Sequence, residues 1–119
     1  MNNTGTKLTL NGISGEQYLF DLFSFDDFSE LRNAFRSMPA VYVFTRRRMF
    51  VNDYTHDLIY LGETEDLSQR FNEHHKEENI MMHHANCIGL HGVTSYEERI
   101  NIEKDILGAY DFPCNEQLN

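Results

Sequence analysis

Two tyrosines, an arginine and a histidine stand at spacings that could bring them together around one substrate. Tyr42 and Tyr60 lie in two short apolar runs, and Arg70 follows Tyr60 by ten residues. His74 comes four residues after Arg70, one turn later on the same face of a helix. A guanidinium grips phosphate through its planar fork, and phenol and imidazole groups can position or transfer protons. These residue types suit chemistry on a phosphate-bearing substrate.

The run from Tyr60 to His74, preceded by Ala40-Val41-Tyr42, resembles the GIY-YIG endonuclease domain, and the resemblance covers residues 39–119. That family has two tyrosine-bearing strand motifs, an arginine and often a histidine on the first helix, a glutamate on a later helix and a terminal asparagine. This sequence departs from the pattern in having Ala40 for glycine and a longer segment between the tyrosines. The matching positions are Tyr42, Tyr60, Arg70, His74, Glu103 and Asn115.

The resemblance implies a metal-dependent endonuclease that hydrolyses phosphodiester bonds in DNA. Glu103 would hold one Mg²⁺ (or Mn²⁺), because this cation prefers oxygen ligands and keeps several of its waters. Arg70 would bind the scissile phosphate, and Tyr42 would activate the attacking water. A phenol with a pKa of about 10 needs nearby positive charge for this role.

The remaining matched residues would support that chemistry. Tyr60 would orient Tyr42, and His74 would relay a proton or bind phosphate. By the same resemblance, Asn115 would orient groups around the site. Each residue alone has an ordinary explanation, because strand tyrosines are usually half-buried and helix charges are usually solvated. Their joint spacing is what favours a catalytic site.

Two other groups of side chains allow more than one interpretation. Arg46, Arg47 and Arg48 form either a solvated hairpin tip or a phosphate contact outside the active site. Imidazole and thiolate groups, the ligands that zinc favours, also gather later in the chain. They lack the paired short spacing of zinc sites, so polar histidines are the simpler interpretation. This second group is His74, His75, His83, His84, Cys87 and His91.

Alternating apolar and polar residues predict a β-hairpin near the N-terminus, with strands at 7–10 and 17–23 around an Asn11-Gly12 turn. Residues 1–5 are expected to form a loose tail. A capping pattern at Asp27 and Glu30 predicts an amphipathic helix over 27–37, before Pro39. These elements form an N-terminal extension, residues 1–38, packed on the core.

The core, residues 39–119, begins with a predicted second hairpin whose strands are 40–46 and 57–62. A helix capped near Asp66 is expected to run to about Glu78, followed by a short strand at 87–92. Capping patterns at 94–98 begin a last helix that ends near Gly108. Without regular βα alternation, this order predicts one globular α+β domain with a small, mainly antiparallel sheet flanked by helices, as in the GIY-YIG fold.

The chain has 119 residues, 10 basic and 19 acidic side chains and a net charge of −9. Most of the excess lies after residue 60, where 4 basic and 12 acidic residues occur. This sign is opposite to that of most nucleic-acid binders. The alternative to a nuclease is therefore a noncatalytic acidic module that keeps the fold and binds a protein. No long apolar run or charged-then-apolar leader occurs, so we expect a cytoplasmic protein with no membrane partner.

Overall fold

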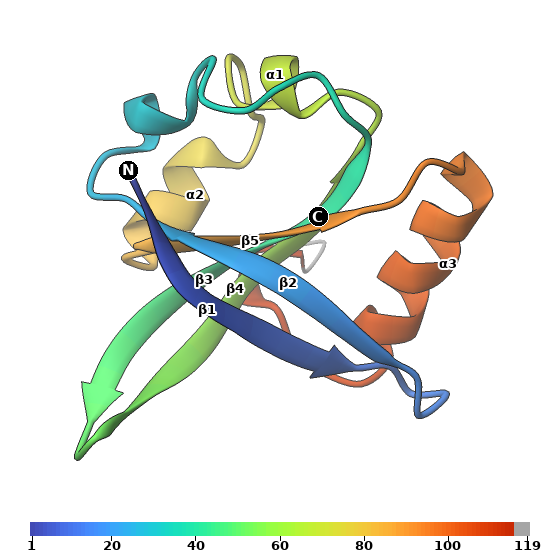
Figure 1. Cartoon of the computed structure of the whole chain (residues 1–119), viewed down its shortest axis with the longest axis horizontal. Helices are drawn as coiled ribbons and strands as arrows, with labels where there is room; N and C mark the ends of the chain where they lie inside the picture. The colour runs from blue at the N-terminus through green and yellow to red at the C-terminus, as the bar shows by residue number, and fades with distance from the viewer. Residues whose placement is uncertain (116–119) are drawn as a thin grey trace.

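The structure, a computed structural model, describes residues 1–115, and its centre is a five-stranded antiparallel sheet (Figure 1). The sheet has the order β1-β2-β5-β3-β4. Both predicted hairpins are confirmed, and β5 joins them by pairing with β2 on one side and β3 on the other. The α+β class is therefore confirmed. The strands are β1 (Asn2–Asn11), β2 (Gln17–Ser24), β3 (Ala40–Phe50), β4 (Asp53–Thr64) and β5 (Cys87–Gly92).

Helical segments cover the two faces of this sheet unequally (Figure 1). Three short ones pack on the face that carries Tyr42 and Phe44: η1 (Phe28–Leu31), α1 (Leu67–Arg70) and α2 (Glu77–Met82). The long helix α3 (Tyr96–Leu107) packs on the opposite face against Val41 and Val43. The last element, η2 (Pro113–Asn115), lies beside the edge strand β4.

The helix expected over 27–37 is only the 3₁₀ turn η1. Its capping box is confirmed, because the Asp27 side chain accepts from Ser29 N–H and Glu30 accepts from the Asp27 N–H. Asn33 then adopts a left-handed backbone conformation with φ of 58°, which stops a right-handed helix. The turn is enough to bury Phe28 and Leu31, so tertiary packing overrides the longer helical pattern.

The helix expected to run from Asp66 to about Glu78 is likewise interrupted. Asp66 caps it as predicted, accepting from the backbone N–H of Ser68 at 2.9 Å, but α1 ends at Arg70. Turns follow, and they direct both Phe71 and His74 into the core before α2 begins. Arg70 and His74 therefore do not share a helix face, and that part of the prediction is wrong.

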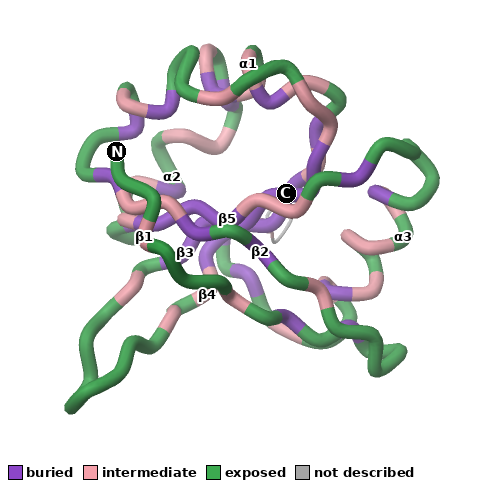
Figure 2. Tube along the Cα trace, viewed as in Figure 1, coloured by how far each residue is buried: buried purple, intermediate pink, exposed green. Residues whose placement is uncertain are grey.

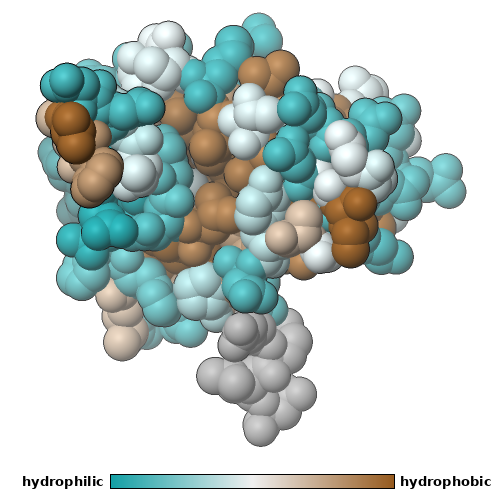
Figure 3. Space-filling view, turned by 90° about the horizontal axis from the view of Figure 1, so that it is seen from below, coloured by the Kyte–Doolittle hydropathy of each residue, from teal (hydrophilic) through white to brown (hydrophobic). Residues whose placement is uncertain are grey.

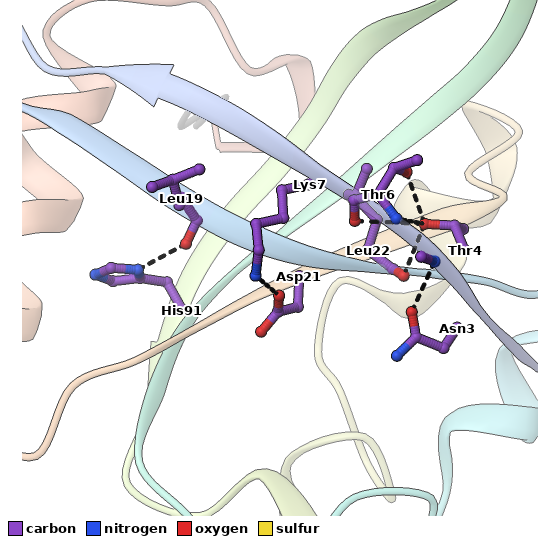
Figure 4. A network of polar contacts seen from close by, with 9 residues as sticks. Asn3, Thr4, Thr6, Lys7, Leu19, Asp21, Leu22 and His91 are labelled. Carbon is purple, nitrogen blue, oxygen red and sulfur yellow. Dashed lines mark hydrogen bonds and ion pairs between the residues drawn. The ribbon is translucent and has the colours of Figure 1, made fainter.

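The N-terminal strand begins earlier than expected, at Asn2, so residues 1–5 are not a loose tail. Thr4 Oγ1 donates to the carbonyl of Leu22 at 3.1 Å, and Lys7 forms an ion pair with Asp21 across the hairpin (Figure 4). The register shifts between Asn3 and Lys7. These cross-strand contacts extend β1 beyond the alternating segment that the sequence makes visible.

The hairpin turn between β1 and β2 rests on α3. The Asp105 carboxylate accepts from the Ser14 N–H at 2.9 Å and from the Tyr18 hydroxyl at 2.7 Å. Helix α3 itself begins as predicted, with the Ser95 side chain accepting from Glu98 N–H. Viewed from below, apolar side chains remain visible in a hollow bounded by polar residues (Figure 3). Within residues 1–115, no helix is long and apolar enough to cross a membrane.

Candidate active site

Tyr42 and His74 form the buried centre of the candidate site. Tyr42 comes from β3, is fully buried, and its phenol oxygen lies 2.7 Å from His74 Nε2. The backbone N–H of Lys76 donates to His74 Nδ1 at 3.0 Å. A neutral imidazole that accepts at Nδ1 carries its proton on Nε2, so His74 donates a hydrogen bond to Tyr42. The short turn after α1 therefore fixes both the position and the tautomer of His74.

Tyr60 lies beside this pair on the neighbouring strand β4, with its ring centroid 5.2 Å from that of His74 and 6.1 Å from that of Tyr42. Gly62 provides the space for this arrangement, because it stands opposite Tyr42 in the β3–β4 register. A Cβ atom at Gly62 would lie 2.6 Å from the Tyr42 hydroxyl and 2.9 Å from the Tyr60 ring. The glycine two residues after Tyr60 is thus required for the close approach of the two phenols.

Arg70, at the end of α1, is the positive charge of the cluster. It is partly exposed, and its Nη2 lies 3.4 Å from His75 Nδ1. Its charge lowers the pKa of Tyr42, Tyr60 and His74, which means that the guanidinium lies near all three groups. An open groove beside it is lined by Thr64, Glu65, Asp66, Gln69, Asn72 and Glu73. Arg70 is therefore the member of the cluster that reaches toward solvent.

Burial dominates the protonation of the aromatic groups. Burial raises the pKa of both tyrosines, and this effect exceeds the lowering by Arg70. The contact between the phenols raises the pKa of Tyr42 and lowers that of Tyr60. Burial, followed by the charges of Arg70 and His75, lowers the pKa of His74 to about 3. At neutral pH the phenols are protonated and His74 is uncharged.

Glu103 approaches this cluster from α3, on the other side of the edge strand. It is partly buried, and its negative charge raises the pKa of Tyr60. Burial raises the pKa of Glu103, and the nearby Glu63 raises it further. Glu63 lies on β4 and accepts a hydrogen bond from Nε of the buried Arg99 at 2.9 Å. The site therefore holds two neighbouring carboxylates, one from the strand and one from the helix.

Sequence reasoning missed Glu63 as a companion of Glu103. The available signal was its place directly after Tyr60-Leu61-Gly62, on the strand that α3 packs against. Two mutually repelling carboxylates suit a divalent cation, which relieves their repulsion. Among residues 1–115, no three His, Cys, Asp or Glu side chains are grouped to hold a metal ion. Any Mg²⁺ held here would take its other ligands from water and substrate oxygens.

Asn115 supports the site by holding the backbone of β4. Its Oδ1 accepts from the Leu61 N–H and its Nδ2 donates to the Leu61 carbonyl, both at 2.7 Å. The side chain pairs with the outer edge of β4 as a neighbouring strand would. Leu61 lies between Tyr60 and Gly62, so Asn115 fixes the strand that carries them. Ala40 is an ordinary buried strand residue paired with Thr64 and Gly92.

The other residues singled out from the sequence lie elsewhere. The three arginines Arg46, Arg47 and Arg48 follow the buried part of β3 and belong to an exposed ribbon. Of the other histidines and the cysteine, Cys87 is buried in β5, and His91 Nδ1 donates to the Leu19 carbonyl at 2.8 Å (Figure 4). His83 and His84 are exposed at the end of α2.

Comparisons of the chain with protein-family models, with curated proteins and with solved structures found no match.

Proposed function

We propose that the chain is a metal-dependent endonuclease that hydrolyses phosphodiester bonds in DNA, with a site of the GIY-YIG type. The observation that carries this proposal is the meeting of four separate segments at one place. Tyr42, Tyr60 and His74 are in mutual contact, with Arg70 beside them. Glu103 lies near Tyr60 on the opposite side of the strand edge. Burying polar groups costs free energy unless they are hydrogen-bonded, so apolar side chains would fill an ordinary core more simply than a tyrosine–histidine pair beside an arginine.

Arg70 is the group best placed to bind the scissile phosphate. Its guanidinium is partly exposed at the mouth of a groove, and a planar fork can donate to two phosphate oxygens. In the absence of substrate, the same charge lies next to two neutral phenols. A bound phosphate would therefore sit within reach of a tyrosine hydroxyl.

Tyr60, rather than Tyr42, is the phenol that contacts the attacking water in this proposal. Tyr42 is completely buried and accepts the His74 hydrogen bond, whereas Tyr60 retains 8% exposure. The contact between the phenols also lowers the pKa of Tyr60 and raises that of Tyr42. This assignment reverses the roles expected from the sequence. In these roles, His74 donates a hydrogen bond that fixes the Tyr42 hydroxyl, and Tyr42 in turn orients Tyr60.

Glu103 and Glu63 would hold the divalent cation. When bound, Mg²⁺ stabilises negative charge developing on phosphate oxygens. Its charge would also keep Glu103 ionised, against the burial that raises the pKa of this carboxyl. The hydrogen bond from Arg99 orients Glu63, which would be the second carboxylate to hold the cation.

Cleavage of supercoiled plasmid and of a branched oligonucleotide, with Mg²⁺ or Mn²⁺, tests this function. We expect nicking by the wild type and a loss of at least about 100-fold in Glu103→Gln and Arg70→Ala. Glu97→Gln, exposed on the first turn of the same helix, and Arg36→Ala, exposed in the loop before β3, are the matched controls.

If the wild type is inert with both metals and both substrates, the nuclease proposal fails. The acidic protein-binding module would then be the better interpretation, because the net charge of −9 opposes binding to a polyanion. If Glu103→Gln cuts as well as the wild type, the carboxylate assignment fails.

A further inference from the structure

The β3–β4 hairpin continues past the sheet as a free two-stranded ribbon, residues 46–57. Strand β5 accompanies β3 only as far as the pair Thr45–Cys87. One further link follows, in which the Asn86 side chain bonds the backbone N–H and carbonyl of Arg47. Beyond it, β3 and β4 pair only with each other, to Phe50 and Asp53. Figure 2 shows this ribbon leaving the buried centre and becoming exposed toward its end.

The ribbon carries the densest positive charge of the chain. The alternation of the strand puts Arg46 and Arg48 on one face and Arg47 on the other. Arg47 lies over the Tyr54 ring at 4.3 Å. Arg48 forms a 2.9 Å ion pair with Asp57 in which both side chains are about half exposed. An exposed pair of this kind contributes little and can be exchanged for another anion.

The end of the ribbon is apolar and exposed. Three consecutive residues are exposed, so both faces of the ribbon are open at this end. They are Met49, Phe50 and Val51, with exposed fractions of 67%, 69% and 77%. Val51 also has a φ of 58°, in the left-handed region where turns normally use glycine, asparagine or aspartate. A β-branched residue there is strained, so folding alone would favour a different side chain. Strain kept at an exposed apolar tip points to a use for the side chain itself.

We propose that this ribbon grips a nucleic-acid duplex, with the arginines on its phosphates and the tip of Met49, Phe50 and Val51 wedged against a base step. Paired cationic and apolar side chains are the combination that kinks duplexes, and a two-stranded ribbon fits into a groove. This inference rests on the proposed function and supplies its substrate class, duplex DNA. It also provides the local positive surface that a chain of net charge −9 needs to approach a polyanion.

The length of β3 fixes where the tip should act. Phe50 is eight positions after Tyr42, which is a distance of roughly 26 Å along the strand at about 3.3 Å per residue. Duplex DNA rises ~3.4 Å per base pair. With the ribbon lying along the duplex axis, the wedge should therefore meet the duplex about 7 or 8 base pairs from a phosphate held beside Tyr42.

The arginine contribution is tested by duplex binding in Ca²⁺ over a range of salt concentrations. All proteins carry Glu103→Gln, so that the duplex stays intact. We expect Arg46→Ala/Arg48→Ala to bind more weakly and to lower the slope of log K against log salt by about 1.8, or about 0.9 per lost phosphate contact. Lys7→Ala, which removes one positive charge from the other hairpin, is the control and should leave the slope unchanged. An unchanged slope in the double variant would overturn the proposal.

The tip is tested with 2-aminopurine placed at successive positions of the same duplex. We expect fluorescence to rise at one step, about 7 or 8 base pairs from the cut where a cut can be mapped, and to lose that rise in Phe50→Ser. Leu19→Ser, a 53% exposed residue of β2, is the control. Val51→Gly separates binding from folding, because it should raise the melting temperature while weakening duplex binding. Weaker binding with a lower melting temperature would indicate a structural role and contradict the wedge.

Failure of this inference and failure of the proposed function give different results. Duplex binding that depends on the arginines, without cleavage by the wild type, would keep the ribbon and reject the nuclease. Cleavage that is insensitive to every ribbon variant would keep the nuclease and reject the ribbon. Binding of the tip to anionic lipid vesicles in preference to the duplex would also reject it.

Discussion

The two ends of the β3–β4 hairpin differ in burial, packing and charge. At the base, Ala40 to Thr45 is buried on both faces, and the strands carry Tyr42, Tyr60 and Gly62 in a close-packed arrangement. At the tip, three arginines and three exposed apolar residues protrude from the sheet, and Val51 is strained. A shift in register between Phe44 and Thr45 separates the two halves.

For the proposed nuclease function, this difference separates two tasks. Catalysis needs groups whose positions and protonation are fixed. Burial, the single tautomer of His74 and the bonds from Asn115 to the Leu61 backbone provide this. Recognition of a long polyanion needs charge that reaches into solvent, and in the cluster at the base Arg70 is the residue that provides it. One hairpin can therefore link the reacting phosphate to a distant part of the same duplex.

The sharpest difference within the base is expected between its two tyrosines. Tyr60→Phe should lower cleavage by about 100-fold or more with little change in stability, because the hydroxyl would contact the reacting water. Tyr42→Phe should instead lower the free energy of unfolding by about 1–3 kcal/mol, because His74 Nε2–H would lose its buried acceptor. Cleavage rates and urea unfolding of both variants measure this. Equal cleavage by Tyr60→Phe and the wild type would remove Tyr60 from the chemistry.

Acid should lower the free energy of unfolding through His74, at the buried end of the hairpin. Its pKa in the folded protein, lowered to about 3, is below that of an unfolded histidine. The fold therefore favours the neutral ring, and this contribution is complete above a pH of about 6.5 and is lost as the pH falls toward about 3. The loss should be on the order of a few kcal/mol. Urea unfolding from pH 7 to 4 should show this decline in the wild type and a flatter profile in His74→Gln.

The exposed His83 offers a matched control, because His83→Gln should keep the wild-type decline. If His74→Gln and the wild type lose stability equally with acid, the buried neutral histidine does not control this response.

Adding a methyl group at the base and removing a side chain at the tip should have opposite effects. Gly62→Ala places a Cβ atom 2.6 Å from the Tyr42 hydroxyl, and it should destabilise the fold by about 1–3 kcal/mol through overpacking. It should also separate the two phenols and lower cleavage. Thermal unfolding and plasmid nicking test this. Gly92→Ala is the control and should destabilise the fold less, because the nearest atom to its Cβ is the flexible end of Met38 at 3.0 Å. Gly15 is unsuitable as a control because its φ of 92° would strain an alanine.

At the tip the expected change in stability is smaller and of opposite sign. Val51→Gly relieves the left-handed strain and should raise the free energy of unfolding by up to about 1 kcal/mol. Calorimetry of Gly62→Ala and Val51→Gly side by side measures these opposite changes in stability. A destabilised Val51→Gly protein would show that the tip packs for folding and is not held for another purpose.

Sequence patterns identified most of the sheet but fewer of the helices. Alternation around Asn11-Gly12 predicts the first hairpin, and the apolar runs at Val41 and Ile59 predict the second. The helix after Asp66 was predicted too long because periodicity does not reveal where tertiary contacts interrupt it. The break depends on Phe71 and His74 both turning inward, and the partner of His74 Nε2 is Tyr42, which is distant in sequence.

The structure brings most of the residues singled out from the sequence together, while their catalytic roles stay a prediction. Tyr42 and Tyr60 lie on the same face, and Tyr60 keeps some exposure because β4 is the edge strand, which spacing in the sequence does not reveal. The resemblance singles out Asn115, but its bonds to Leu61 could not be predicted because they require η2 to lie against β4. Glu63 becomes visible only when α3 brings Glu103 beside it.

We propose that the residues at the base of the hairpin cut DNA and that its tip binds the duplex. Binding and Mg²⁺-dependent cleavage of one end-labelled duplex by Glu103→Gln and by Arg46→Ala/Arg48→Ala separate these two roles. We expect Glu103→Gln to bind the duplex as the wild type does but not to cut it. We expect the arginine variant to cut poorly at moderate salt because it binds poorly, and to recover activity when salt is lowered. Wild-type cutting and binding by both variants would overturn this division of roles.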